Sequence, residues 1–136
     1  MISVIRLTAA VSKTSGPIVP PPPDALGVIA AVNGHCLGSG IGLVGSADLL
    51  VAAEGATFGL PEVDNGALGA ATHLMRLVSV QRARWMLYSC ERATAEELYS
   101  YGSVLRVVAG DQLAVEAREL ASVIAAKDPT VIRACL

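Results

Sequence analysis

Hydrophobic and polar positions fall in blocks along this chain, and the blocks predict strands and helices in alternation. Two short apolar runs, residues 27–32 (GVIAAV) and 48–53 (DLLVAA), combine small and β-branched side chains, which is typical of buried strands. Residues at helical spacing after Asp111, which we expect to cap the helix, predict a long amphipathic helix. Its apolar face carries Leu113, Ala117, Leu120, Ala121 and Ile124.

Shorter patterns complete the expected order of elements. We expect brief strands at 57–59 and 104–108, and helices at 38–47, 68–77, 80–88 and from Pro129 onward. Thr94 and Glu97 have the spacing of a capping box, in which each side chain bonds the backbone N–H of the other residue. Strands that alternate with helices in this way indicate the α/β class.

The first 25 residues differ from the rest and form a separate, proline-rich segment. Pro17 and residues 20–23 are prolines, and such a run favours an extended conformation that cannot enter a sheet interior. A linker is the preferred interpretation, and a ligand for proline-recognition domains is the alternative. Residues 2–7 have the composition of an edge strand, and the folded core is expected over residues 26–136.

Composition narrows the classes of partner. Hydrophobic residues make up 53% of the chain and charged residues 16%, which predicts apolar faces shared with partner chains. The net charge of −2 argues against a nucleic-acid partner. Residues 25–47 carry no charge, but glycines and polar side chains interrupt them, so we expect neither a membrane span nor export.

The three cysteines are odd in number and far apart, without a CxxC pair. This spacing argues against a disulfide framework and against a zinc site, and no metal site is expected. We interpret all three as reduced, buried thiols of a cytoplasmic protein.

Residues 34–48 contain five glycines, an unusual density inside an apolar stretch. Gly40, Gly42 and Gly45 match the GxGxxG pattern of dinucleotide-binding folds. Seven residues separate Val32, the end of the first strand, from Gly40, and too few follow Gly45 for a parallel crossover. The spacing therefore argues against a dinucleotide site.

A second interpretation treats the glycines as an oxyanion-binding turn. A strand, an Asn-Gly turn and the start of a short helix would present backbone N–H groups to a carbonyl oxygen that approaches closely. Downstream, Glu62 places one carboxylate among apolar neighbours, which suits it to proton transfer beside a carbonyl. The alternative is that Glu62 simply follows a proline at a surface turn.

The stretch VIAAVNGHCLGSGIGLVGSADLLVAAEGATFGLPEVDNGALG resembles the core of the crotonase family, the enoyl-CoA hydratases and isomerases. The similarity continues through residues 73–129 and covers about residues 26–136 in one register. It implies a partial crotonase-like fold, a spiral of ββα turns, that assembles as trimers or hexamers. It also implies an acyl-CoA thioester substrate, whose carbonyl two backbone N–H groups hold, and no cofactor beyond the coenzyme A of the substrate.

Carried onto this chain, the resemblance places one oxyanion-hole donor at Ser39 and one catalytic carboxylate at Glu62. The second carboxylate of the hydratases falls at Gly42, and the aspartate of the dienoyl isomerases falls at Ala70. We therefore expect double-bond isomerisation rather than hydration. The residues expected to line the substrate site are Gly38, Gly40, Phe58, Pro61 and Gly66.

The resemblance begins in the middle of the family, whose first half supplies the other oxyanion donor. Three hypotheses follow from this. The chain is an enzyme with Glu62 as its acid/base, or a non-catalytic acyl-CoA-binding or assembly subunit completed by another chain, or an inactive truncated remnant.

Overall fold

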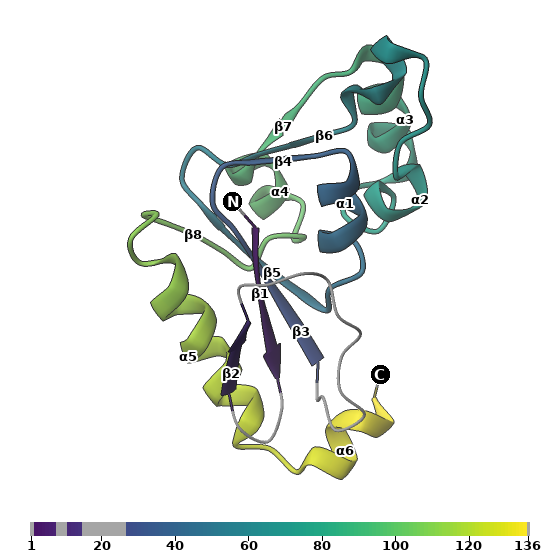
Figure 1. Ribbon diagram of the computed structural model, residues 1–136. Coiled ribbons are helices and arrows are strands. Elements are labelled where there is room, and N and C mark those ends of the chain that lie inside the picture. The colour runs from purple at the N-terminus through teal and green to yellow at the C-terminus, as the bar shows by residue number, and fades with distance from the viewer. Residues whose placement is uncertain (1, 8–10, 15–26, 136) are drawn as a thin grey trace.

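The computed structural model describes residues 2–7, 11–14 and 27–135 and has the expected α/β class (Figure 1). Its strands are β1 (Ile2–Leu7), β2 (Val11–Thr14), β3 (Gly27–Val32), β4 (His35–Leu37), β5 (Leu49–Ala53), β6 (Thr57–Gly59), β7 (Ala93–Thr94) and β8 (Arg106–Val108). Its helices are α1 (Ser39–Val44), the 3-10 helix η1 (Pro61–Asn65), α2 (Ala71–Leu74), α3 (Val80–Ser89), α4 (Ala95–Ser100), α5 (Leu113–Ala125) and α6 (Pro129–Ala134).

The larger sheet has the strand order β2-β1-β3-β5-β8. β3, β5 and β8 are parallel, whereas β1 and β2 form an antiparallel pair along one side. Residues 2–7 are a strand as predicted, but β1 lies between β2 and β3 and is not an edge. The prediction was wrong because residues 11–14 pair with β1 and cover its outer side. The prolines of the N-terminal segment lie outside the described residues.

The smaller sheet joins β4, β6 and β7, and it gives the fold its repeating ββα turn. Each turn runs from a long strand of the larger sheet into a short strand of the smaller one and then into helical structure: β3, β4 and α1, followed by β5, β6 and η1 with α2. In Figure 1 the smaller sheet and α1 to α4 lie at one end, with α5 along the larger sheet at the other. The partial ββα spiral expected from the resemblance is therefore present.

Both faces of the central parallel strands are buried, which explains their lack of polar side chains. Alternate residues of β3 enter different cores, because successive side chains point to opposite faces of a sheet. Ala30 and Val32 face the cluster beneath α1 to α4, whereas Ile29 and Ala31 face α5. The predicted apolar face of α5 is confirmed, since Leu113, Ala117 and Ala121 are buried and Leu120 and Ile124 pack against them.

Helix ends were predicted with mixed success. The capping box at Thr94 and Glu97 is confirmed, with both reciprocal hydrogen bonds formed. Asp111 does not cap α5, because the chain turns once more and Gln112 occupies the N-cap without a side-chain bond. The helix expected over 68–77 is confined to α2, and Leu68 before it is fully exposed.

Only one of the three cysteines is fully buried, which corrects the expectation for the set. Cys36 lies in the core, where burial raises the pKa of its thiol to about 12. Cys90 is half-buried and Cys135 is exposed, and all three are free thiols. Within the described ranges, no helix is both long and apolar enough to cross a bilayer.

Cys90→Gly is expected to stabilise the chain. Cys90 ends α3 with φ +55°, the one non-glycine residue of the described part with a left-handed backbone. A Cβ is disfavoured there, so glycine should raise the free energy of unfolding by about 0.5–1 kcal/mol, which urea denaturation measures. Cys135→Gly is the control, because Cys135 has φ −89° and should gain nothing. An unchanged or lower value for Cys90→Gly would contradict the prediction.

Candidate active site

Glu62 is held by a short segment that leaves the smaller sheet. β6 ends at Gly59, Leu60 follows as a fully buried residue, and Pro61 then opens η1. Proline suits this first helical position because its fixed φ matches a helical turn. Glu62, the second residue of η1, is half-buried and turns back toward the end of β4.

The carboxylate of Glu62 lies against the backbone of two glycines. A Cβ added to Gly38 would stand 2.4 Å from Oε1 of Glu62, and one added to Gly69 would stand 3.2 Å from Oε2. Oε2 is buried and has no hydrogen-bond partner. A buried acceptor without a partner carries a free-energy penalty, so this oxygen is available to a group that a ligand would bring.

Gly38 also has a backbone conformation that requires glycine. Its φ of +58° and ψ of −119° lie outside the regions that residues with a Cβ readily adopt. Its N–H donates to the carbonyl of Gly59 over 3.1 Å, so the pairing of β4 with β6 continues into this turn. The turn and the segment that carries Glu62 are therefore fixed to each other by the smaller sheet.

Ser39, the predicted oxyanion donor, is the first residue of α1 and directly follows Gly38. The N–H groups of a first helical turn have no intrahelical acceptor and carry partial positive charge. The side chain of Ser39 is exposed. Its backbone N–H therefore starts a helix immediately beside the glycine that contacts Glu62.

Gly42 and Ala70 lie close to each other, near the segment that contacts Glu62. A Cβ added to Gly42 would stand 3.8 Å from the Cβ of Ala70, and Ala70 follows Gly69, which contacts Glu62. These are the two positions at which the resemblance would place a second carboxylate. They face each other beside the site, and neither residue can transfer a proton.

The other predicted substrate-binding residues are placed differently. Gly40 is buried inside α1, and Pro61 is half-buried at the start of η1. Phe58 is 0% exposed and belongs to the core, so its side chain supports β6 and is closed to a ligand. Gly66 ends η1 in a left-handed conformation with open space beside it. The structure thus brings Gly38 together with Glu62, whereas the Phe58 side chain is enclosed in the core and a Cβ at Gly66 would have no atom within 4 Å.

Gly69, which contacts the Glu62 carboxylate, was not predicted from the sequence as part of the site. The signal was available in the spacing of GALG, where a second glycine follows Gly66 by three residues in a stretch that also holds the fully exposed Leu68. The interpretation of residues 68–77 as one helix hid this signal, because a helix would have turned Gly69 into ordinary packing.

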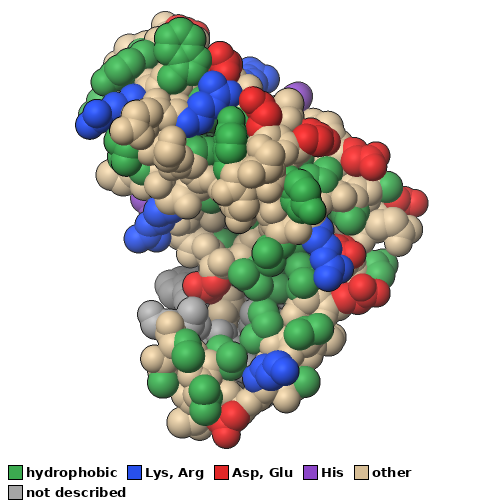
Figure 2. Space-filling view, turned by 180° about the vertical axis from the view of Figure 1, so that it is seen from behind, with side chains coloured by type: hydrophobic (Ala, Val, Ile, Leu, Met, Phe, Trp, Pro, Cys, Tyr) green, Lys and Arg blue, Asp and Glu red, His purple; other side chains and the backbone are tan. Residues whose placement is uncertain are grey.

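Basic and acidic side chains are interspersed over the face of the molecule drawn in Figure 2. A hollow of about 560 Å³ is lined by residues that include Arg76, Arg82 and Tyr101, but neither Glu62 nor Gly38 lines it. Among the described residues, no group of three or more His, Cys, Asp or Glu could hold a metal ion.

Comparison with known proteins gives a consistent set of relatives. Residues 25–136 match the family described as enoyl-CoA hydratase/isomerase. A (7aS)-7a-methyl-1,5-dioxo-2,3,5,6,7,7a-hexahydro-1H-indene-carboxyl-CoA hydrolase from Rhodococcus jostii is 55% identical over 80% of this chain and 42% of its own length. A mevalonyl-coenzyme A hydratase from Aspergillus fumigatus is 46% identical over 78% of this chain and 40% of its own.

Solved structures agree with these relatives. An enoyl-CoA hydratase from Mycobacterium paratuberculosis superimposes with a TM-score of 0.74 at 29% identity, covering 79% of this chain and 50% of that one. A second, enoyl-CoA hydratase subunit I from Geobacillus kaustophilus, gives a TM-score of 0.73 at 39% identity over 77% of this chain and 42% of that one. The chain thus spans about half, or less, of the length of the proteins it matches.

Proposed function

Because the chain belongs to the enoyl-CoA hydratase/isomerase family, we propose that it acts on an acyl-CoA thioester with Glu62 as the proton-transferring group. One observation carries the proposal: the Glu62 carboxylate, with its buried and unpartnered Oε2, lies against Gly38 at the start of α1. A carboxylate held in this way can take a proton from the carbon beside a thioester carbonyl. Coenzyme A enters as part of the substrate, with no other cofactor.

The charge that develops on the thioester oxygen needs hydrogen-bond donors. We assign one of them to the backbone N–H of Ser39, which follows Gly38 directly. Gly38 lets the Glu62 carboxylate approach the start of α1, because a Cβ at Gly38 would stand 2.4 Å from its Oε1. Proton removal by Glu62 and stabilisation of the enolate by Ser39 then occur on adjacent groups.

A single carboxylate favours isomerisation over hydration. Hydration needs one group to activate water and another to deliver a proton, and Gly42 and Ala70 supply neither. Glu62 alone can remove a proton from one carbon of a 3-enoyl-CoA and return it two carbons away. We therefore propose double-bond isomerisation as the reaction.

Hydrolysis is a second candidate for the reaction. Two relatives at 55% and 56% identity are named hydrolases of an indene-carboxyl-CoA that bears two oxo groups. Their similarity supports a CoA thioester of a fused-ring diketone as the substrate, with Glu62 activating water. Two alternatives without catalysis remain: an acyl-CoA-binding or assembly subunit, and an inactive remnant. We also propose that the chain assembles as trimers or hexamers in the cytoplasm.

A deuterium-exchange experiment tests the function. The purified chain is incubated with a 3-enoyl-CoA or a 2-enoyl-CoA in deuterated water, and the acyl carbons are followed by NMR. Deuterium at C2 or C4 without a 3-hydroxy product supports isomerisation. A 3-hydroxy product would overturn the assignment of Gly42 as disabling. No exchange with either substrate would overturn isomerisation and leave hydrolysis of a different thioester or the non-catalytic alternatives.

Gly42→Glu is expected to add hydration to the proposed activity. A Cβ at Gly42 meets only the Cβ of Ala70 at ordinary contact distance, so a side chain can start there, and we expect the new carboxylate to reach the site from beside Ala70. We expect a 3-hydroxyacyl-CoA product from a 2-enoyl-CoA, measured by NMR. Gly42→Gln is the matched control, since it has the same shape without a base, and equal product from both variants would contradict the prediction.

A further inference from the structure

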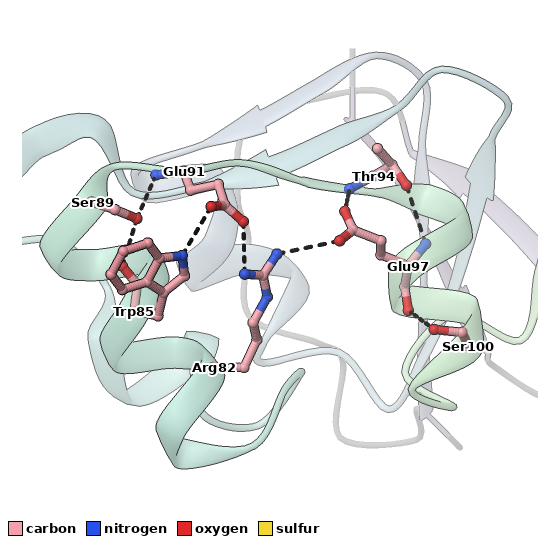
Figure 3. A network of polar contacts seen from close by, with 7 residues as sticks. All are labelled: Arg82, Trp85, Ser89, Glu91, Thr94, Glu97 and Ser100. Carbon is pink, nitrogen blue, oxygen red and sulfur yellow. Dashed lines mark hydrogen bonds and ion pairs between the residues drawn. The ribbon is translucent and has the colours of Figure 1, made fainter.

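Arg82 of α3 lies between two glutamates that flank a strand of the smaller sheet (Figure 3). Its Nη1 is 2.7 Å from Oε1 of Glu91, and its Nη2 is 3.3 Å from Oε1 of Glu97. The indole N–H of Trp85 donates to the other oxygen of Glu91 over 2.9 Å. The Arg82 side chain is 22% exposed, so the guanidinium is partly shielded from water.

The two glutamates stand on either side of β7, which pairs antiparallel with β6. Between them, Arg92 packs on the last residue of β6: a Cβ added to Gly59 would stand 3.1 Å from Cγ of Arg92. The C-terminal end of β7 is also bonded to the start of β6, because the N–H of Ala95 donates to the carbonyl of Ala56 over 3.0 Å. The network around Arg82 therefore joins α3 to both flanks of β7, the strand that pairs with β6 on the side opposite β4.

Gly59, the last residue of β6, also bonds to the candidate site. The carbonyl of Gly59 accepts the N–H of Gly38, and Glu62 follows three residues later with its carboxylate on Gly38. We propose that Arg82 is a positioning residue, which ties both flanks of β7 and through β6 fixes Gly38 relative to Glu62. The consequence of this role for catalysis rests on the proposed function, whereas the effect of Arg82 on the position of Gly38 does not.

The electrostatics of the network support this role. The Trp85 indole and the Arg82 guanidinium hold the pKa of Glu91 below its usual range. Burial lowers the pKa of Arg82, but the hydrogen bond and charge of Glu91 outweigh burial, so the net shift is upward. Without the Arg82 guanidinium, Glu91 and Glu97 would both lose this ion-pair partner, and the two flanks of β7 would no longer be joined to each other through α3.

The expected effect is local, because partly exposed ion pairs add little to the stability of a whole domain. Amide hydrogen exchange measured by NMR distinguishes a local effect at Gly38 from a loss of stability of the whole fold. In Arg82→Met, exchange at Gly38 should accelerate about tenfold more than exchange at Ala52, which lies in the larger sheet. Equal acceleration at the two amides, or none at Gly38, would overturn the proposal, since it would mean that Arg82 stabilises the fold as a whole or acts elsewhere.

Two further variants keep the test decisive. Arg106→Met removes a more exposed ion pair, with Glu116, from the edge of the larger sheet and should leave Gly38 exchange within about twofold of wild type. Glu91→Gln keeps an exposed, hydrogen-bonding side chain but removes the charge, so it serves if Arg82→Met does not fold. It should accelerate Gly38 exchange in the same direction by about threefold, and no change there would also overturn the proposal.

Crotonyl-CoA binding to the wild type and to Arg82→Met separates this inference from the proposed function. If the wild type binds and Arg82→Met binds about tenfold more weakly, a displaced Gly38 explains the loss. If the wild type does not bind crotonyl-CoA, the proposed action on short enoyl-CoA thioesters fails, and the Gly38 exchange alone decides the role of Arg82. Equal binding by both proteins would overturn a positioning role for Arg82 at the site.

Discussion

Glu62→Gln is expected to lower the rate of deuterium incorporation beside the thioester by about 10²–10⁴-fold, because the amide cannot act as a general base. The substitution keeps the shape of the side chain, so the contacts with the backbones of Gly38 and Gly69 remain. Affinity for the acyl-CoA should therefore change little. The measurement is the NMR exchange rate under saturating substrate, with binding followed separately by calorimetry.

Asp64→Asn is the matched control for this prediction. Asp64 lies in the same 3-10 helix, two residues from Glu62, but its side chain is exposed. Its loss should leave the exchange rate within about twofold, since a solvated carboxylate outside the site moves no proton of the substrate. A full rate in Glu62→Gln, or an equal loss in both variants, would refute Glu62 as the acid/base and favour the binding-only alternative.

Gly38→Ala is expected to destabilise the chain and to displace Glu62. The new Cβ would stand 2.4 Å from Oε1 of Glu62, and the backbone of Gly38 has a φ of +58°. Either the carboxylate leaves its position or the turn moves away from Gly59, whose carbonyl accepts the Gly38 N–H. The backbone strain lowers the free energy of unfolding by about 1–3 kcal/mol, whereas the flexible Glu62 side chain can move aside at little further cost, so its displacement should show mainly in acyl-CoA binding. Urea denaturation and acyl-CoA binding would measure both consequences.

Gly55→Ala is the control that separates backbone strain from the contact with Glu62. Gly55 also has a positive φ, +76°, but nothing lies within 4 Å of the Cβ it would gain. It should show backbone strain alone, of about 1 kcal/mol, and unchanged acyl-CoA binding. If both variants lost the same stability and kept the same binding, the contact between Gly38 and Glu62 would not matter to the site.

The glycine-rich stretch, the least usual feature of the sequence, has several separate causes. Gly38 supplies a positive φ and a contact surface for Glu62, whereas Gly45 lets the end of α1 approach α2, where a Cβ would stand 2.6 Å from the carbonyl oxygen of His73. Gly42 supplies neither and leaves space facing Ala70. A pattern of glycines shows that backbones come close, but not which segment each one meets, so these partners could not be read from the sequence.

Buried strands and the long helix were predictable because their periodicity is strong. β3, β5 and α5 lie where the apolar runs placed them. β4 was missed because its three residues directly follow the Asn33-Gly34 turn inside the glycine-rich stretch and were interpreted as part of that turn. Gly69 was missed because its role depends on a contact with Glu62 that folding creates. Local pattern thus predicted the scaffold, whereas the walls of the candidate site depend on contacts between segments.

The pairing of β4 with β6 limits which changes in chain length the protein can accept. His35, Cys36 and Leu37 lie opposite Thr57, Phe58 and Gly59 in one register. One residue inserted into the Asn33-Gly34 turn would move Gly38 by about 3.3 Å along β6 and turn Cys36 out of the core, since neighbouring side chains of a strand face opposite ways. Surface turns ordinarily tolerate insertions, but the length of this one determines whether the glycine and the carboxylate meet.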